Sequence, residues 1–114
     1  MSRLELLVDQ IGSARRYSLS LLDDIAEGDW FRMPSGGITH VAWQVGHLAF
    51  AEYRLALERI RGVRPDDPHL ISDGFLTQFG RGSVPDPDPA TYPRPGAIRA
   101  VLDRVHRRAL EELN

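Results

Sequence analysis

Four histidines, at positions 40, 47, 69 and 106, are the side chains best suited to metal or acid–base chemistry. The sequence contains no cysteine, which excludes thiolate metal sites, disulfides and cysteine nucleophiles. No two histidines stand four residues apart, so no helix can present two imidazoles to one metal at one-turn spacing. His40 and His47 are two helical turns and about 10 Å apart, which is too far for one ion to bind both. Spacing alone therefore favours ordinary surface or boundary positions for all four.

His47 has the most informative neighbours of the four. It follows Gly46, and a glycine inside a helix costs about 1 kcal/mol relative to alanine, which indicates a close approach by another part of the chain. Two interpretations stay open: a solvated face carrying an Arg54–Glu58 ion pair at i, i+4 spacing, or a polar pocket between helices. On a helical wheel one polar stripe carries His40, Gln44, His47, Arg54 and Glu58.

The remaining chemical motifs are weak. The run Gly80-Arg81-Gly82-Ser83 lacks the Gly-Lys-Ser/Thr ending of a phosphate-binding P-loop and the third glycine of a dinucleotide fingerprint. Ser83 also lacks the G-x-S-x-G turn of a serine hydrolase. Adjacent acids at 23–24, 66–67 and 111–112 would point about 100° apart on a helix, so we interpret them as solvation and helix-termination features.

Three helices are predicted to position these side chains. Apolar residues recur at three- and four-residue steps over about residues 3–27, 39–61 and 95–113. Gly28 and Gly62 fit helix stops, Thr39 fits the N-cap of the second helix, and Pro95 fits the first position of the third. The sequence therefore predicts an all-α fold in one domain, residues 1–114.

The second predicted helix is apolar around most of its circumference, so we expect it at the centre of a bundle. Its aromatic residues Trp43, Phe50 and Tyr53 are interpreted as core or interface side chains. Two helical partners would leave part of this surface in water, at a loss of roughly 1.5–3 kcal/mol per large side chain. Another chain or a fourth helix would cover it, so we expect self-association, as a homodimer.

A long connection, residues 63–95, holds seven of the eight prolines. So many fixed φ angles predict no regular helix across it beyond one short turn. Apolar residues near its middle are expected to fold back on the core. We interpret the connection as a crossover that lets the second and third helices run parallel.

Composition excludes some partners. A net charge of −2 and a pI near 6.0 argue against nucleic acid or an anionic membrane as the main partner. No apolar stretch approaches the roughly 20 residues that span a bilayer, and the N-terminus has no signal-peptide pattern. The expected location is the cytoplasm.

Residues 38–49, with the core Trp43-Gln44-Val45-Gly46-His47, resemble the second helix of the DinB-like superfamily. The amphipathic first helix, the crossover segment 79–85 and the helix entry at 92–95 agree, so the resemblance covers essentially the whole chain. It implies an up-up-down-down four-helix bundle with a long crossover between helices 2 and 3. Members of this superfamily are often homodimeric.

The resemblance also implies a divalent metal, zinc or nickel, held by three histidines. His47 matches the ligand on the second helix; the other two form an H-x-x-x-H pair on the fourth helix. Because the sequence ends after the third predicted helix, we expect an incomplete bundle and an incomplete metal triad. Within the chain, His40 and His106 are the candidates to replace a missing ligand.

Three hypotheses about function stay open. The first is a metal-dependent hydrolase or thiol-dependent transferase that acts on a small molecule, as the resemblance implies. The second is a non-catalytic, dimerising helical bundle or binding module with a vestigial site. The third is that these 114 residues are a fragment of a longer gene product.

Overall fold

The computed structural model describes residues 2–33, 39–86 and 88–113, with side chains throughout except at positions 4, 7, 8, 11, 12, 14, 17, 18 and 113. Every regular element in these ranges is helical, which confirms the all-α prediction. None of the described helices is long and apolar enough to cross a membrane. Most of the apolar face predicted for the first helix lies outside the described side chains.

The first helix, α1, spans Arg3–Asp23 and is shorter than the predicted 3–27. Its start carries a capping box, in which the Ser2 hydroxyl accepts from the Glu5 amide and the Glu5 carboxylate accepts from the Ser2 amide. The chain leaves the helix after residue 23 and forms a single 3-10 turn, Glu27–Asp29. This exit buries Trp30, whose carbonyl accepts a hydrogen bond from the Ala42 amide at the start of the second helix.

The second helix, α2, spans Val41–Glu52 and continues through a π-helical segment, Tyr53–Glu58, into α3, Arg59–Arg61. This continuous rod confirms the prediction of a helix over about 39–61. It stops at Gly62, whose φ of 81° favours glycine. The predicted cap is wrong, because the N-cap is His40 rather than Thr39.

The crossover is more helical than predicted. It contains α4, Asp67–Leu70, and α5, Asp73–Phe79, followed by a 3-10 turn, Pro89–Thr91. Prolines do not prevent these helices, because Pro68 lies in the first turn of α4, where its missing N–H has no intrahelical partner to lose. The Ser72 hydroxyl then caps α5 by accepting from the Phe75 amide at 3.1 Å.

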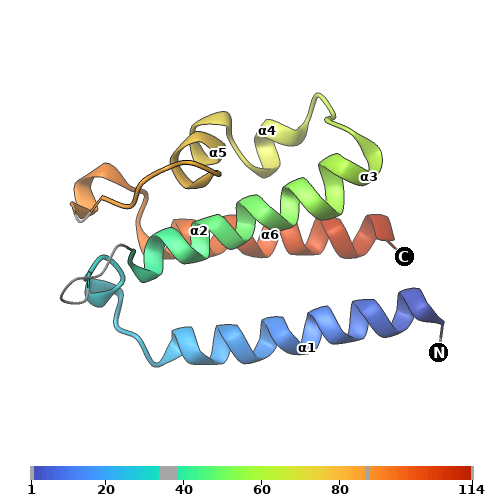
Figure 1. The fold of residues 1–114 in the computed structure, drawn as a ribbon, viewed down its shortest axis with the longest axis horizontal. Coiled ribbons are helices and arrows are strands. Elements are labelled where there is room, and N and C mark those ends of the chain that lie inside the picture. Colours follow the sequence, from blue (N-terminus) through green and yellow to red (C-terminus); the bar gives the residue numbers. More distant parts are fainter. Residues whose placement is uncertain (1, 34–38, 87, 114) are drawn as a thin grey trace.

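The last helix, α6, spans Pro95–Leu113 and runs parallel to α2, as the crossover interpretation predicted (Figure 1). α1 runs in the opposite direction to both (Figure 1). The order of directions is thus down-up-up rather than the up-up-down start expected from the resemblance. The reason is the connection after α1, which reverses the chain, whereas the crossover carries the chain back to the end where α2 began.

The core lies where α2, α5 and α6 meet, and α2 packs against both of the other two helices. α2 is therefore central, as its apolar circumference predicted. The surface of the continuous rod nevertheless keeps large apolar side chains in solvent, with Leu48 in α2 51% exposed and Leu55 in the π-helical segment 59% exposed. The fully buried large side chains are Leu57, Ile71, Phe79, Ile98 and Val105.

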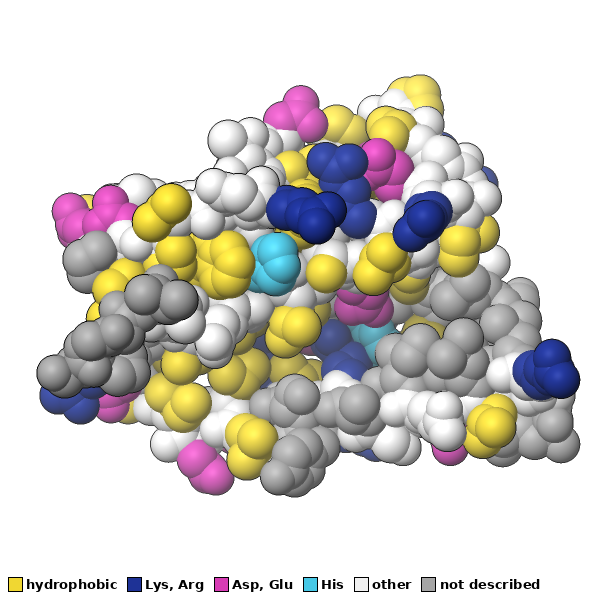
Figure 2. All heavy atoms as spheres, in the orientation of Figure 1, with side chains coloured by type: hydrophobic (Ala, Val, Ile, Leu, Met, Phe, Trp, Pro, Cys, Tyr) yellow, Lys and Arg dark blue, Asp and Glu magenta, His cyan; other side chains and the backbone are white. Residues whose placement is uncertain are grey.

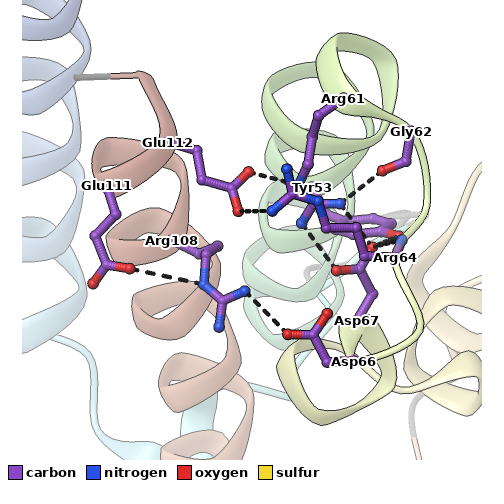
Figure 3. A network of polar contacts seen from close by, with 9 residues as sticks. All are labelled: Tyr53, Arg61, Gly62, Arg64, Asp66, Asp67, Arg108, Glu111 and Glu112. Atoms are coloured by element: carbon purple, nitrogen blue, oxygen red, sulfur yellow. Dashed lines mark hydrogen bonds and ion pairs between the residues drawn. The ribbon is translucent and has the colours of Figure 1, made fainter.

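A buried ion-pair network joins α3, α4 and α6 (Figure 3). Asp67 is 2% exposed and accepts two hydrogen bonds from the Arg61 guanidinium, at 2.9 and 3.0 Å. Arg61 also donates to Glu112, and the Tyr53 hydroxyl donates to Asp67 at 2.9 Å. The interpretation of 66–67 and 111–112 as solvation and termination features is therefore wrong for Asp67 and Glu112, which fix the crossover to the end of the bundle.

This network changes the acidity of its members. The hydrogen bonds from Arg61 lower the pKa of Asp67 to about 2, despite its burial. Burial, together with the bond to Asp67, raises the pKa of Tyr53 to about 12. The charged carboxylate and the neutral phenol are thus the forms that the folded chain favours at ordinary pH.

Candidate functional site

His47 lies on α2 where that helix faces α5. The Nδ1 atom of its imidazole is 2.9 Å from the carbonyl oxygen of Phe79. Because a carbonyl can only accept, Nδ1 carries the proton and donates, which leaves the lone pair on Nε2. Metal-binding histidines commonly have this arrangement, since the bond at one nitrogen fixes both the tautomer and the direction of the other.

Gly46 makes the His47–Phe79 bond possible. A Cβ atom at position 46 would lie 2.3–2.7 Å from three carbons of the Phe79 ring. Only glycine lets that ring seat directly against α2, which brings the Phe79 carbonyl within reach of the next residue's imidazole. The close approach predicted from a glycine inside a helix is confirmed, and the neighbour is an aromatic ring.

Aromatic rings hold the imidazole from both sides. The Trp43 ring stacks on His47 with centroids 4.6 Å apart and planes 10° apart, and Phe50 lies on the other side at 5.6 Å. The Trp43 indole donates to the Ser83 hydroxyl at 2.9 Å, and that hydroxyl donates to the Gly80 carbonyl at 2.6 Å. The Gly80–Ser83 run, which matches no phosphate motif, thus has a structural role in fixing the stack.

His40 does not belong to the polar stripe predicted for α2. It is 2% exposed, and its Nδ1 accepts from the Trp43 amide at 3.0 Å, which caps the helix. Its Nε2 donates to the carbonyl of Asp86 at 2.7 Å. Both nitrogens are used within the fold, so His40 has no lone pair for a metal, and the idea that it replaces a ligand is wrong.

The other two histidines are separate from His47. The Nδ1 of His106 donates to the Glu52 carboxylate at 2.7 Å, a contact that joins α6 to α2. His69 is exposed on α4 and lines a cleft of about 360 Å³ against α6. Within the described parts of the chain, no group of three or more His, Asp or Glu side chains could hold a metal. His106 therefore does not complete a triad with His47 there.

The predicted polar stripe does carry the Arg54–Glu58 ion pair, in the π-helical segment that continues α2, with Nη1 and Oε1 2.9 Å apart. Both interpretations of this stripe hold in part, because Arg54 also lines an open groove of about 320 Å³ between α2 and the end of α5. Figure 2 shows a histidine on this face among hydrophobic side chains, with arginine side chains beside it. We call the open groove of about 320 Å³ the Phe50 groove. Its lining residues are Phe50, Arg54, Leu76, Thr77, Gly80 and Arg81.

The family model described as the DinB superfamily matches residues 10–114. Residues 38–49 resemble the second helix of this same superfamily, and the match confirms that resemblance. No curated protein matches the chain. No solved structure matches it either.

Proposed function

This chain belongs to the DinB superfamily, and on that premise we propose that it is a metal-dependent protein of the cytoplasm in which His47 is one ligand of a zinc or nickel ion. Its reaction would be that of a hydrolase or a thiol-dependent transferase acting on a small molecule. A bound divalent ion supplies Lewis acidity and lowers the pKa of a coordinated water or thiol.

The observation that carries this proposal is the tautomer of His47. The Phe79 carbonyl accepts a hydrogen bond from Nδ1–H of His47. The rings of Trp43 and Phe50 restrain the plane of the imidazole. Nε2 is therefore held in one direction with its lone pair available. Neutral imidazole of this kind suits both zinc and nickel.

The described residues do not complete a metal site. A catalytic zinc site needs about three protein ligands, and His47 supplies one. Both ring nitrogens of His40 are used in other contacts, and His106, whose Nδ1 donates to Glu52, belongs to no group of three possible ligands among the described residues. The remaining ligands would come from outside the described residues, from a second copy or a further segment, and we derive no reaction step from a site that lacks them.

Metal content tests this proposal directly. The purified chain, the His47→Ala variant and the His69→Ala variant are compared by elemental analysis after zinc loading and desalting. We expect His47→Ala to lose the metal and His69→Ala, which removes an exposed histidine on α4, to keep it. Equal metal in all three proteins, or none in the unaltered chain, would contradict the assignment.

A second candidate function is a non-catalytic bundle that dimerises through α2. It is favoured by Leu48 in α2 and Leu55 in the π-helical segment that continues it, both of which are large apolar side chains more than half exposed. Light scattering after gel filtration of Leu48→Gln tests it, with Val84→Gln as the control because Val84 is 81% exposed in the crossover. We expect Leu48→Gln to convert a dimer to a monomer and Val84→Gln to leave it unchanged. A monomer for the unaltered chain would count against this candidate.

A further inference from the structure

We propose that the Phe50 groove binds the carboxylate of a small organic acid whose apolar body lies against Phe50, beside His47. This inference deepens the proposed function, on which it rests for treating the groove as the substrate side of the site. The binding itself depends on the lining residues of the groove and on no metal ion.

The charge of the groove is the first support. Its lining contains two arginines and no acidic side chain, although the protein as a whole has a net charge of −2. Arg81 is exposed, and within the described ranges it has no hydrogen bond or ion pair. An arginine presents its N–H donors as a planar fork that matches the two oxygens of a carboxylate.

Arg54, the second arginine of the lining, is held in place by two contacts. Its Cζ lies 5.2 Å from the centre of the Phe50 ring, and one Nη donates to Glu58 at 2.9 Å. A guanidinium has five N–H donors, so this single bond leaves donors for a ligand. The contacts to Phe50 and Glu58 therefore fix the Arg54 side chain and leave N–H donors of its guanidinium free to bind a carboxylate.

Part of the lining is apolar, which favours an organic acid over an inorganic anion. Phe50 and Leu76 supply this surface, and the Thr77 hydroxyl is turned back to the Asp73 carbonyl at 3.0 Å. A volume of about 320 Å³ lies at the small end of the range for small-molecule sites. A compact apolar body with one carboxylate suits both this apolar surface and the two arginines.

The groove continues to the candidate site through stacked rings. Phe50 forms part of its lining and also stacks on His47, at a centroid distance of 5.6 Å. A ligand held by its carboxylate at Arg54 and Arg81, with its body on Phe50, therefore lies one ring away from the imidazole, which is not itself part of the lining. This placement gives the arginines a positioning role and leaves the chemistry to the His47 end.

Benzoate is a suitable probe, and binding to the full chain is followed by chemical-shift changes of backbone amides. We expect saturable shifts at Phe50, Thr77 and Arg81, and at least tenfold weaker binding for Arg81→Gln and Arg54→Gln. Arg104→Gln is the matched control, because Arg104 is an exposed arginine on α6 outside the groove. Equal weakening by Arg104→Gln would show a general charge effect and overturn the proposal.

Two further ligands test the stated chemistry. Benzamide keeps the apolar body without the charge, and inorganic phosphate keeps the charge without the body, so we expect both to bind at least tenfold more weakly than benzoate. If either binds as well as benzoate, the proposed ligand class is wrong. His47→Ala separates this inference from the proposed function. We expect this variant to lose the metal and to keep benzoate binding. If the unaltered chain binds benzoate but no metal, the groove is supported and the metal site is refuted, whereas metal binding without benzoate binding by the unaltered chain refutes the groove alone.

Discussion

Replacing Gly46 by alanine tests how His47 is positioned. The added Cβ would lie 2.3, 2.4 and 2.7 Å from three carbons of the Phe79 ring. Non-bonded carbons normally stay about 3.5–4.0 Å apart, so the ring must retreat by roughly 1 Å. Phe79 has 0% exposure and is surrounded by core side chains, which leaves it no open space to enter.

The expected loss of stability follows from two opposing effects. Overpacking a filled core costs about 1–3 kcal/mol, and the rigid, fully buried ring places this case near 3 kcal/mol. Alanine in a helix interior returns about 1 kcal/mol relative to glycine. The net decrease in the free energy of unfolding is therefore about 2 kcal/mol. The same shift would lengthen the 2.9 Å bond between His47 Nδ1 and the Phe79 carbonyl beyond hydrogen-bonding range.

Two measurements check this reasoning. Urea unfolding gives the change in stability, and long-range ¹H–¹⁵N correlation spectra show whether the proton of His47 leaves Nδ1 for a mixture of tautomers. Gly96→Ala in α6 is the control, because its Cβ would meet no heavy atom closer than 4.0 Å, and we expect it to stabilise the chain slightly. If Gly46→Ala stabilises the chain equally and leaves the tautomer unchanged, the contact does not position His47.

Two other predictions concern the buried polar contacts. Because the pKa of Asp67 falls from 3.8 to about 2 on folding, its ion pair contributes about 2 kcal/mol above pH 4, which is lost as the pH falls from about 4 to 2. In urea unfolding the stability gap between the unaltered chain and Asp67→Asn should shrink over this range, and a constant gap would contradict the assignment. His40→Ala should cost about 2 kcal/mol by removing the cap at Trp43 and the bond to Asp86. It should leave the metal content unchanged, and a loss of metal matching that of His47→Ala would mean that His40 is a ligand.

Apolar periodicity predicts the long helices well, since a helix packed on two neighbours needs apolar residues at those steps. It predicts α6 and the α2–α3 rod closely. It predicts α1 too long, because it cannot detect that the chain leaves the helix early to bury Trp30 beside the start of α2. Counting prolines underestimates α4 and α5, because Pro68 is harmless in the first turn of α4 and α5 lies between residues 69 and 84, where there is no proline.

Within the candidate site, sequence identifies His47 and the unusual glycine before it, but not the partner of either. Phe79 reaches Gly46 only through the path of the crossover, which no local pattern encodes. Sequence alone favours a solvation or helix-termination role for Asp67 for the same reason, because its partners Tyr53 and Arg61 meet it only after the chain turns at Gly62. The helical wheel predicts His40 in the polar stripe because a wheel assumes that every side chain points outward, whereas this imidazole turns back to the end of the helix.

The parallel arrangement of α2 and α6 has a consequence for synthesis of the chain. The ribosome adds 52 residues between Arg61 and Leu113, which takes about 3–10 s at ordinary elongation rates. During this interval α2, apolar on most sides, waits for its main partner and is a target for chaperones and for aggregation. α5 is complete only 18 residues after Arg61, or about 1–4 s. Seating Phe79 on Gly46 would therefore shield the nascent helix before α6 exists.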